Sequence, residues 1–125
     1  MIIHAVKVLS WPQADQAGAG WDVFDGPDIK LVILDGVQNI YQSPNFYEDA
    51  IPGQNIIFYP ELSLFFPDRP LTMRIYDYDD GLTTDDLIGG IEGKMYREGQ
   101  RFPEKLTMQC AGCTVSVEVE VSYYF

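Results

Sequence analysis

Residues 77–89 contain five aspartates and follow an apolar segment with alternating pattern. The five are Asp77, Asp79, Asp80, Asp85 and Asp86. Carboxylate oxygens are the ligands that hard divalent cations prefer. The alternation in Leu71–Tyr76 predicts a strand, and the same period of two carries Asp77 and Asp79 to one side of the chain. Two neighbouring carboxylates repel each other, so a bound divalent cation is the simplest way to stabilise the pair. We therefore predict a metal site here.

A second acidic segment, residues 20–32, predicts the other half of that site. Asp22 and Asp28 lie six residues apart across a bend rich in Gly and Pro, and Asp25 at its tip is expected to face solvent. Calcium takes about 6–8 oxygen ligands in loose geometry, which two acidic loops can supply together. Magnesium fits less well because it prefers few protein ligands and keeps its water. The expected cofactor is therefore calcium.

The elements that must position these loops are strands. Turn signals separate short apolar or alternating segments, and no window shows helical periodicity with caps. Pro60 interrupts the apolar stretch that contains the fourth and fifth of the nine candidate segments, and about eight of these segments are expected to form strands. We predict an all-β chain, an eight-stranded antiparallel β-sandwich. The segments are Ile2–Leu9, Ile29–Leu34, Val37–Tyr41, Gln54–Tyr59, Leu62–Phe66, Leu71–Tyr76, Leu87–Ile91, Glu104–Gln109 and Thr114–Phe125.

The last segment has the cleanest pattern and fixes an inner and an outer face. Its inward residues are expected to be Val115, Val117, Val119 and Val121, and its outward residues Ser116, Glu118, Glu120 and Ser122. The whole chain, residues 1–125, has the length of one domain, with no internal repeat.

Charge limits the partners. The chain has 19 acidic and 8 basic residues, a net charge of −11, which argues against nucleic acid and against constitutive attraction to anionic membranes. An acidic partner would need a bridging cation. Residues 31–68 contain no Lys or Arg.

Other candidate chemistry is weaker. Cys110 and Cys113 have redox or half-zinc-site spacing, but they precede a strand, and a small disulfide-closed turn or two free thiols are expected instead. His4, the single histidine, sits in the first strand, where we expect a surface or satisfied core role. No nucleophile is expected to meet a base, so we predict that the chain is not an enzyme.

The first residues, Met1–Leu9, lack the basic start, apolar region and cleavage site of a signal peptide. We expect either a cytoplasmic protein or a mature or excised domain. The compartment stays unknown, and a parent protein or protein partner is open.

The two acidic segments resemble those of the C2 domain family, calcium-dependent phospholipid-binding β-sandwiches. Asp22 and Asp28 match the spacing of the family's first loop. Asp77 and Asp79, ahead of Leu87-Ile88-Gly89, are similar to its later loop. Counting forward from Asp79 selects Asp85 as a third ligand, whereas counting back from Gly89 selects Asp86.

The resemblance implies a function and a topology. A single strand before the first loop and a long closing strand look like the family's second circular permutation. The implied function is a soluble calcium-binding module that docks reversibly onto phospholipid membranes and is peripheral when calcium is bound. Its membrane contacts would be Trp21, Val23, Phe24 and Leu82, although Trp21 and Phe24 could instead pack under the loop. The alternative is a non-lipid protein- or carbohydrate-interaction sandwich, with Tyr123 or Tyr124 exposed on a strand and any calcium structural.

Overall fold

A computed structural model describes residues 1–11, 27–48, 50–51, 54–64, 69–78, 86–95, 104–109 and 115–123. These residues form nine strands and follow the period-two pattern of the sequence. The strands are β1 (Ile2–Ser10), β2 (Ile29–Asp35), β3 (Gln38–Gln42), β4 (Ile56–Phe58), β5 (Leu62–Ser63), β6 (Pro70–Asp77), β7 (Asp86–Lys94), β8 (Lys105–Gln109) and β9 (Ser116–Ser122).

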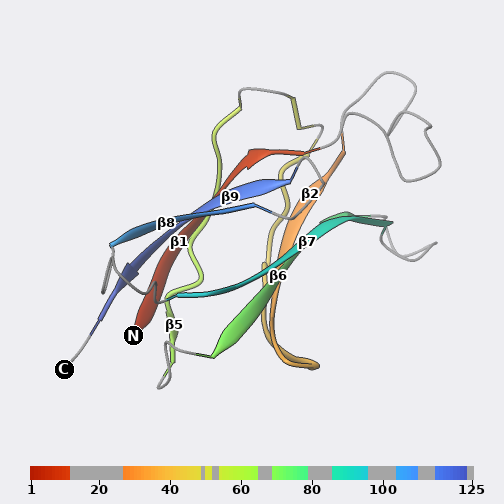
Figure 1. The fold of residues 1–125 in the computed structure, drawn as a ribbon. Coiled ribbons are helices and arrows are strands. Elements are labelled where there is room, and N and C mark those ends of the chain that lie inside the picture. Colours follow the sequence, from red (N-terminus) through yellow and green to blue (C-terminus); the bar gives the residue numbers. More distant parts are fainter. Residues whose placement is uncertain are drawn as a thin grey trace.

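The strands form two antiparallel sheets. One has the order β4-β1-β9-β8, with β5 also paired to β1, and the other has the order β3-β2-β6-β7 (Figure 1). The first and last strands are neighbours, since β1 pairs with β9 from Ile2↔Ser122 to Ser10↔Ser116. The predicted antiparallel β-sandwich is therefore confirmed.

The register gives the sandwich two distinct ends. At one end, here called the acidic end, β1 finishes at Ser10, β2 begins at Ile29 and β6 finishes at Asp77. The other end, here called the terminal end, contains the start of β1 and the finish of β9, which lie side by side (Figure 1).

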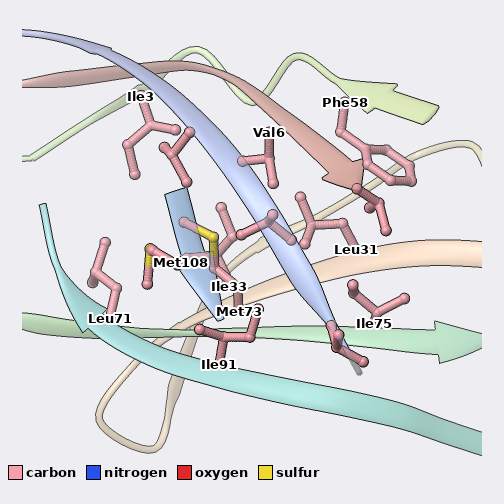
Figure 2. Close-up of a cluster of buried hydrophobic side chains, with 14 of the residues drawn as sticks. Ile3, Val6, Leu31, Ile33, Phe58, Leu71, Met73, Ile75, Ile91 and Met108 are labelled. Carbon is pink, nitrogen blue, oxygen red and sulfur yellow. The ribbon is translucent and has the colours of Figure 1, made fainter. Parts of the chain in front are cut away.

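The core lies between the sheets because each strand turns its apolar residues inward. Figure 2 shows Ile3, Val6 and Phe58 from one sheet facing Met73, Ile75 and Ile91 from the other. The valines of β9 at 115, 117, 119 and 121 are all buried, as predicted. No buried side-chain polar atom among the described residues is left without a hydrogen bond.

The strand count differs from eight because the edge next to β1 is broken. β4 and β5 both pair with β1, and Tyr59, Pro60 and Glu61 separate them. Val37, predicted within a strand, lies instead in the turn between β2 and β3, where it is 99% exposed. Gly36 before it has a φ of 63°, the left-handed conformation that tight hairpin turns need. Among the described residues, no helix is long and apolar enough to cross a membrane.

Candidate functional site

Three chain segments that carry the predicted ligands meet at the acidic end. Ile29 pairs with Asp77 across β2 and β6, and Asp77 pairs in turn with Asp86 at the start of β7. Asp28 directly precedes β2. The antiparallel register therefore brings residues 28, 77 and 86 together from positions far apart in the sequence.

Asp77 is the best-defined carboxylate of this end. It lies on the same face of β6 as Met73 and Ile75, and only 7% of it is exposed. Its Oδ1 accepts a 2.8 Å hydrogen bond from the backbone N–H of Asp28, and the Asp28 carbonyl accepts one of 2.8 Å from the N–H of Tyr78. A carboxylate has about four lone-pair sites, so this group can brace the backbone and still bind a cation. Asp77 is thus part of the folded frame, although the sequence pattern suggested only a loop residue.

Most of the other predicted site residues lie outside the described residues. This applies to the ligand candidates Asp22, Asp79 and Asp85 and to the membrane-contact candidates Trp21, Val23, Phe24 and Leu82. Asp86 is described as a strand residue, but its side chain is not. Within the described part of the chain, no three His, Cys, Asp or Glu side chains are grouped so as to hold a metal ion. Calcium ligation therefore stays a prediction.

A third loop, described at residues 43–48 and 50–51, lies at the same end and was not among the predicted site elements. Tyr47 forms two backbone hydrogen bonds with Ile29, and the Ala50 N–H donates to the Pro27 carbonyl. These bonds pin the loop beside the start of β2. Its position follows from the hairpin of β2 and β3, because a chain that turns at Gly36 must return to the acidic end.

An aromatic stack joins this third loop to the end of β6. The rings of Phe46 and Tyr78 lie 4.5 Å apart at 24°, and the Lys30 ammonium sits 5.4 Å from the centre of the Tyr78 ring. Such cation–π and stacking contacts stabilise neighbouring segments by about 0.5–1.5 kcal/mol each. The stack therefore supports the backbone directly after Asp77.

Apolar side chains are exposed at the acidic end. Ile51 is 60% exposed and Phe46 39%, both in the third loop, and Leu9 and Leu87 are exposed near the ends of their strands. Single exposed apolar residues are ordinary on a soluble surface, so the signal lies in their gathering at one end. Only the topology shows this, because the four residues are scattered in the sequence.

The terminal end contains a hydrogen-bonded chain of three polar side chains. His4 Nε2 lies 2.7 Å from Ser122 Oγ, and His4 Nδ1 lies 3.0 Å from Glu61 Oε2. The sequence analysis did not predict this contact between a serine hydroxyl and the single histidine. Tyr123, considered as an exposed interaction residue, is partly buried, and its hydroxyl donates a hydrogen bond to the Met95 carbonyl. Tyr124, Cys110 and Cys113 lie outside the described residues.

Comparison with known proteins adds one structural likeness. The chain is similar to the crystal structure of a C2 domain protein from Ramazzottius varieornatus, with 16% sequence identity, a TM-score of 0.48, and coverage of 96% of this chain and 90% of that one. A likeness this weak carries no argument about function. No family model matches the chain, and no curated protein matches it. The fold class therefore rests on the two sheets themselves, an antiparallel β-sandwich.

Proposed function

We propose that this chain is a calcium-binding module that docks reversibly onto phospholipid membranes through the acidic end of its sandwich. The observation that carries the proposal is the bond from the Asp28 N–H to the Asp77 carboxylate, because it ties the roots of both acidic segments together. Asp22 precedes one root and Asp79 follows the other by two residues. Loops anchored this close can fold their carboxylates around shared cations.

The register of β7 supports a choice for the third ligand. Ile75 pairs with Gly89 and Tyr76 with Leu87, so Ile88 is an extra residue in a β-bulge. A surplus residue in the strand would explain the one-residue difference between the count from Asp79 and the count from Gly89. On that basis we propose Asp85, selected by the count from Asp79, as the third ligand.

Charge supplies the mechanism of docking. The proposed ligands, Asp22, Asp28, Asp77, Asp79 and Asp85, would repel an anionic lipid surface. Two calcium ions would bring four positive charges to these five negative ones and could share their remaining coordination sites with lipid phosphates. Attraction would then act over a Debye length of about 8 Å.

Apolar insertion would follow neutralisation. Trp21, Val23, Phe24 and Leu82 stay the predicted membrane contacts, and the exposed Ile51 joins them because its loop is pinned beside Pro27. Burying apolar surface contributes about 25 cal/mol per Å², so one inserted isoleucine strengthens binding measurably.

Sedimentation with phosphatidylserine-containing vesicles tests the proposal. The chain is expected to pellet in calcium and to stay in solution with chelator, and Asp79→Asn should abolish pelleting. Ile51→Ser should weaken pelleting while sparing calcium binding. Val37→Ser is the matched control, since Val37 is an exposed apolar residue at the opposite end. Calcium-independent pelleting, or equal losses in the two serine variants, would refute docking through the acidic end.

A second candidate function is a protein- or carbohydrate-interaction module. A groove of about 540 Å³ lies beside the edge strands β3 and β4, and aromatic rings and prolines dominate its lining. Such surfaces suit sugar rings or extended peptides. The lining residues are Tyr41, Ser43, Pro44, Asn45, Phe46, Tyr47, Ile57, Phe58, Tyr59 and Pro60. Vesicle-independent binding of a glycan or peptide that Tyr59→Ala removes would favour this function.

A further inference from the structure

Ser122, His4 and Glu61 form a hydrogen-bonded chain at the terminal end, remote from the acidic loops. Ser122 Oγ lies 2.7 Å from His4 Nε2, and His4 Nδ1 lies 3.0 Å from Glu61 Oε2. We propose that this chain is a reactive serine site, with Ser122 as nucleophile, His4 as general base and Glu61 as a positioning residue. The proposal departs from our prediction that the chain is not an enzyme, which assumed that no nucleophile lies beside a base.

The hydrogen-bonding capacities fix the direction of the chain. An ionised carboxylate only accepts hydrogen bonds, so the proton between His4 and Glu61 belongs to Nδ1. In the neutral imidazole Nε2 is then an acceptor, and the Ser122 hydroxyl must donate to it. This is the arrangement in which a base withdraws the proton of a serine nucleophile while a carboxylate holds the imidazole in the right tautomer.

Two backbone irregularities aim side chains at this point. His4 has no partner in the pairing of β1 with β9, because Ile3 pairs with Val121 and Ala5 with Glu120. Such a bulge re-aims a side chain and is over-represented beside active sites. Glu61 has a φ of 46°, a left-handed conformation that costs a residue with a Cβ about 1–3 kcal/mol. A regular strand at either position would direct His4 or Glu61 elsewhere.

A pocket gives the serine access to a small molecule. The pocket has a volume of about 450 Å³, and both His4 and Ser122 line it. Glu104, Glu120 and Lys105 also line it, and Lys105 is its single Lys or Arg among the described residues. The Lys105 ammonium is the group suited to stabilise a developing oxyanion. With two glutamates against one lysine, the site favours a small neutral or cationic carboxylic ester over an anionic one.

The reaction we assign is acyl transfer from such an ester. Ser122 Oγ attacks the carbonyl carbon, and its proton passes to His4 Nε2. The carbon–oxygen bond to the alcohol then breaks, and the same proton goes to the leaving alkoxide, which leaves the acyl group on Ser122. Water, activated by His4, attacks this acyl group, so that a carboxylic acid is released and Ser122 is restored.

An alkyl fluorophosphonate tests the nucleophile directly, since attack by the serine oxygen on phosphorus expels fluoride and leaves a stable adduct. Intact mass and peptide mapping of the whole chain should show one adduct, on Ser122. Ser122→Ala should abolish labelling, and His4→Gln should slow it by about a hundredfold or more, in line with loss of a general base. Both variants are to be checked for folding by circular dichroism.

The unaltered chain contains its own control. Ser10 Oγ and Ser116 Oγ lie 2.7 Å apart across the same strands, β1 and β9, but with no imidazole between them. Both serines should stay unlabelled. Labelling of Ser116 at the rate of Ser122, no adduct on Ser122, or an unchanged rate in His4→Gln would each overturn the proposal. The first two outcomes are measured on the unaltered chain, so a folding defect in a variant cannot explain them.

The role of Glu61 has a separate readout. The chain has one histidine, so the ¹⁵N signals of its imidazole are unambiguous. They should show the proton on Nδ1 in the unaltered chain and a mixture of tautomers in Glu61→Gln. Labelling of Ser122 should slow by about tenfold in that variant and hydrolysis of p-nitrophenyl acetate with it. An unchanged tautomer with an unchanged rate would leave Glu61 as a surface contact and refute its positioning role.

Discussion

The carboxylates at the two ends of the sandwich differ in burial and in hydrogen-bond donor. At the acidic end, Asp77 is almost fully buried, and a backbone N–H is its hydrogen-bond donor. At the terminal end, the Glu61 side chain is 61% exposed, and its donor is the imidazole of His4, itself 35% exposed. The first carboxylate braces two strands against each other, whereas the second orients another side chain. The buried Asp77 carboxylate therefore supports the fold, whereas the exposed Glu61 carboxylate can be altered with little loss of stability.

The largest expected difference between the two ends is the effect of their carboxylates on stabilisation by calcium. A ligand at about 100 times its Kd adds roughly 2.7 kcal/mol per site to the free energy of unfolding. We expect calcium, against chelator, to raise the melting temperature by several degrees, and Asp79→Asn to remove that rise. Glu61→Gln should keep it, because Glu61 lies at the other end.

The same measurement sharpens the assignment of the third ligand. Asp85→Asn should remove most of the calcium-dependent rise, and Asp86→Asn should keep it. The reverse result would show that the bulge at Ile88 does not account for the extra residue. No rise at millimolar calcium in the unaltered chain would contradict the metal site.

Removing the buried carboxylate of Asp77 should cause the next largest loss in the free energy of unfolding. Asp77→Ala takes away the acceptor of the Asp28 N–H, for which we expect a loss of about 1–3 kcal/mol in the free energy of unfolding without calcium. Asp77→Asn keeps an acceptor oxygen and should lose less, while still weakening calcium binding. Glu61→Ala removes an exposed pair and should cost under about 1 kcal/mol. Urea unfolding of the three variants would compare them, and equal losses at Asp77 and Glu61 would break the contrast.

Two glycines of β7 allow the packing of the core to be compared at two positions. A Cβ on Gly89 would come within 2.6 Å of Val115 Cγ2, a branched and stiff side chain. A Cβ on Gly93 would come equally close to Met108 Cε, the far end of a flexible side chain. Gly89→Ala should therefore destabilise by about 1–3 kcal/mol, and Gly93→Ala by clearly less. Thermal unfolding would distinguish them, and a larger loss at Gly93 would contradict this reading of the core.

Alkaline pH should have the smallest effect. Burial raises the pKa of the Tyr41 and Tyr123 phenols, so the folded chain holds these protons more tightly than the unfolded chain. The resulting stability is fully present below a pH of about 10 and is lost as the pH rises further. Tyr41→Phe should flatten the decline in melting temperature above that pH. An identical decline in the variant would show that Tyr41 contributes nothing to it.

The fold could be predicted from the sequence because the period of two is local. The alternating valines of β9 and the apolar positions of β6 specify which face is buried before any pairing is known. The acidic end was predictable for a related reason, since its aspartates lie directly beside strand ends. Ser122 was also placed correctly, on the outward face of β9.

The reactive serine site could not be predicted because its parts meet through pairing. His4 is 118 residues from Ser122 and 57 from Glu61. Their contact depends on a bulge at His4 and on a left-handed backbone conformation at Glu61. Neither position is a glycine, the residue type that would have indicated such a conformation in the sequence. The burial of Asp77 was missed for a similar reason, because a strand pattern does not say where the core ends.

The break at Pro60 and Glu61 also bears on self-association. An unbroken strand at the edge of a sheet offers a row of unpaired N–H and C=O groups to any neighbouring chain. Here the edge beside β1 is divided into a three-residue and a two-residue strand. The residues between them include Pro60, which has no N–H, and Glu61, which has a left-handed backbone conformation. Neither fragment is long enough to template a second sheet. The kink that aims Glu61 at His4 therefore also guards this edge of the sandwich against aggregation.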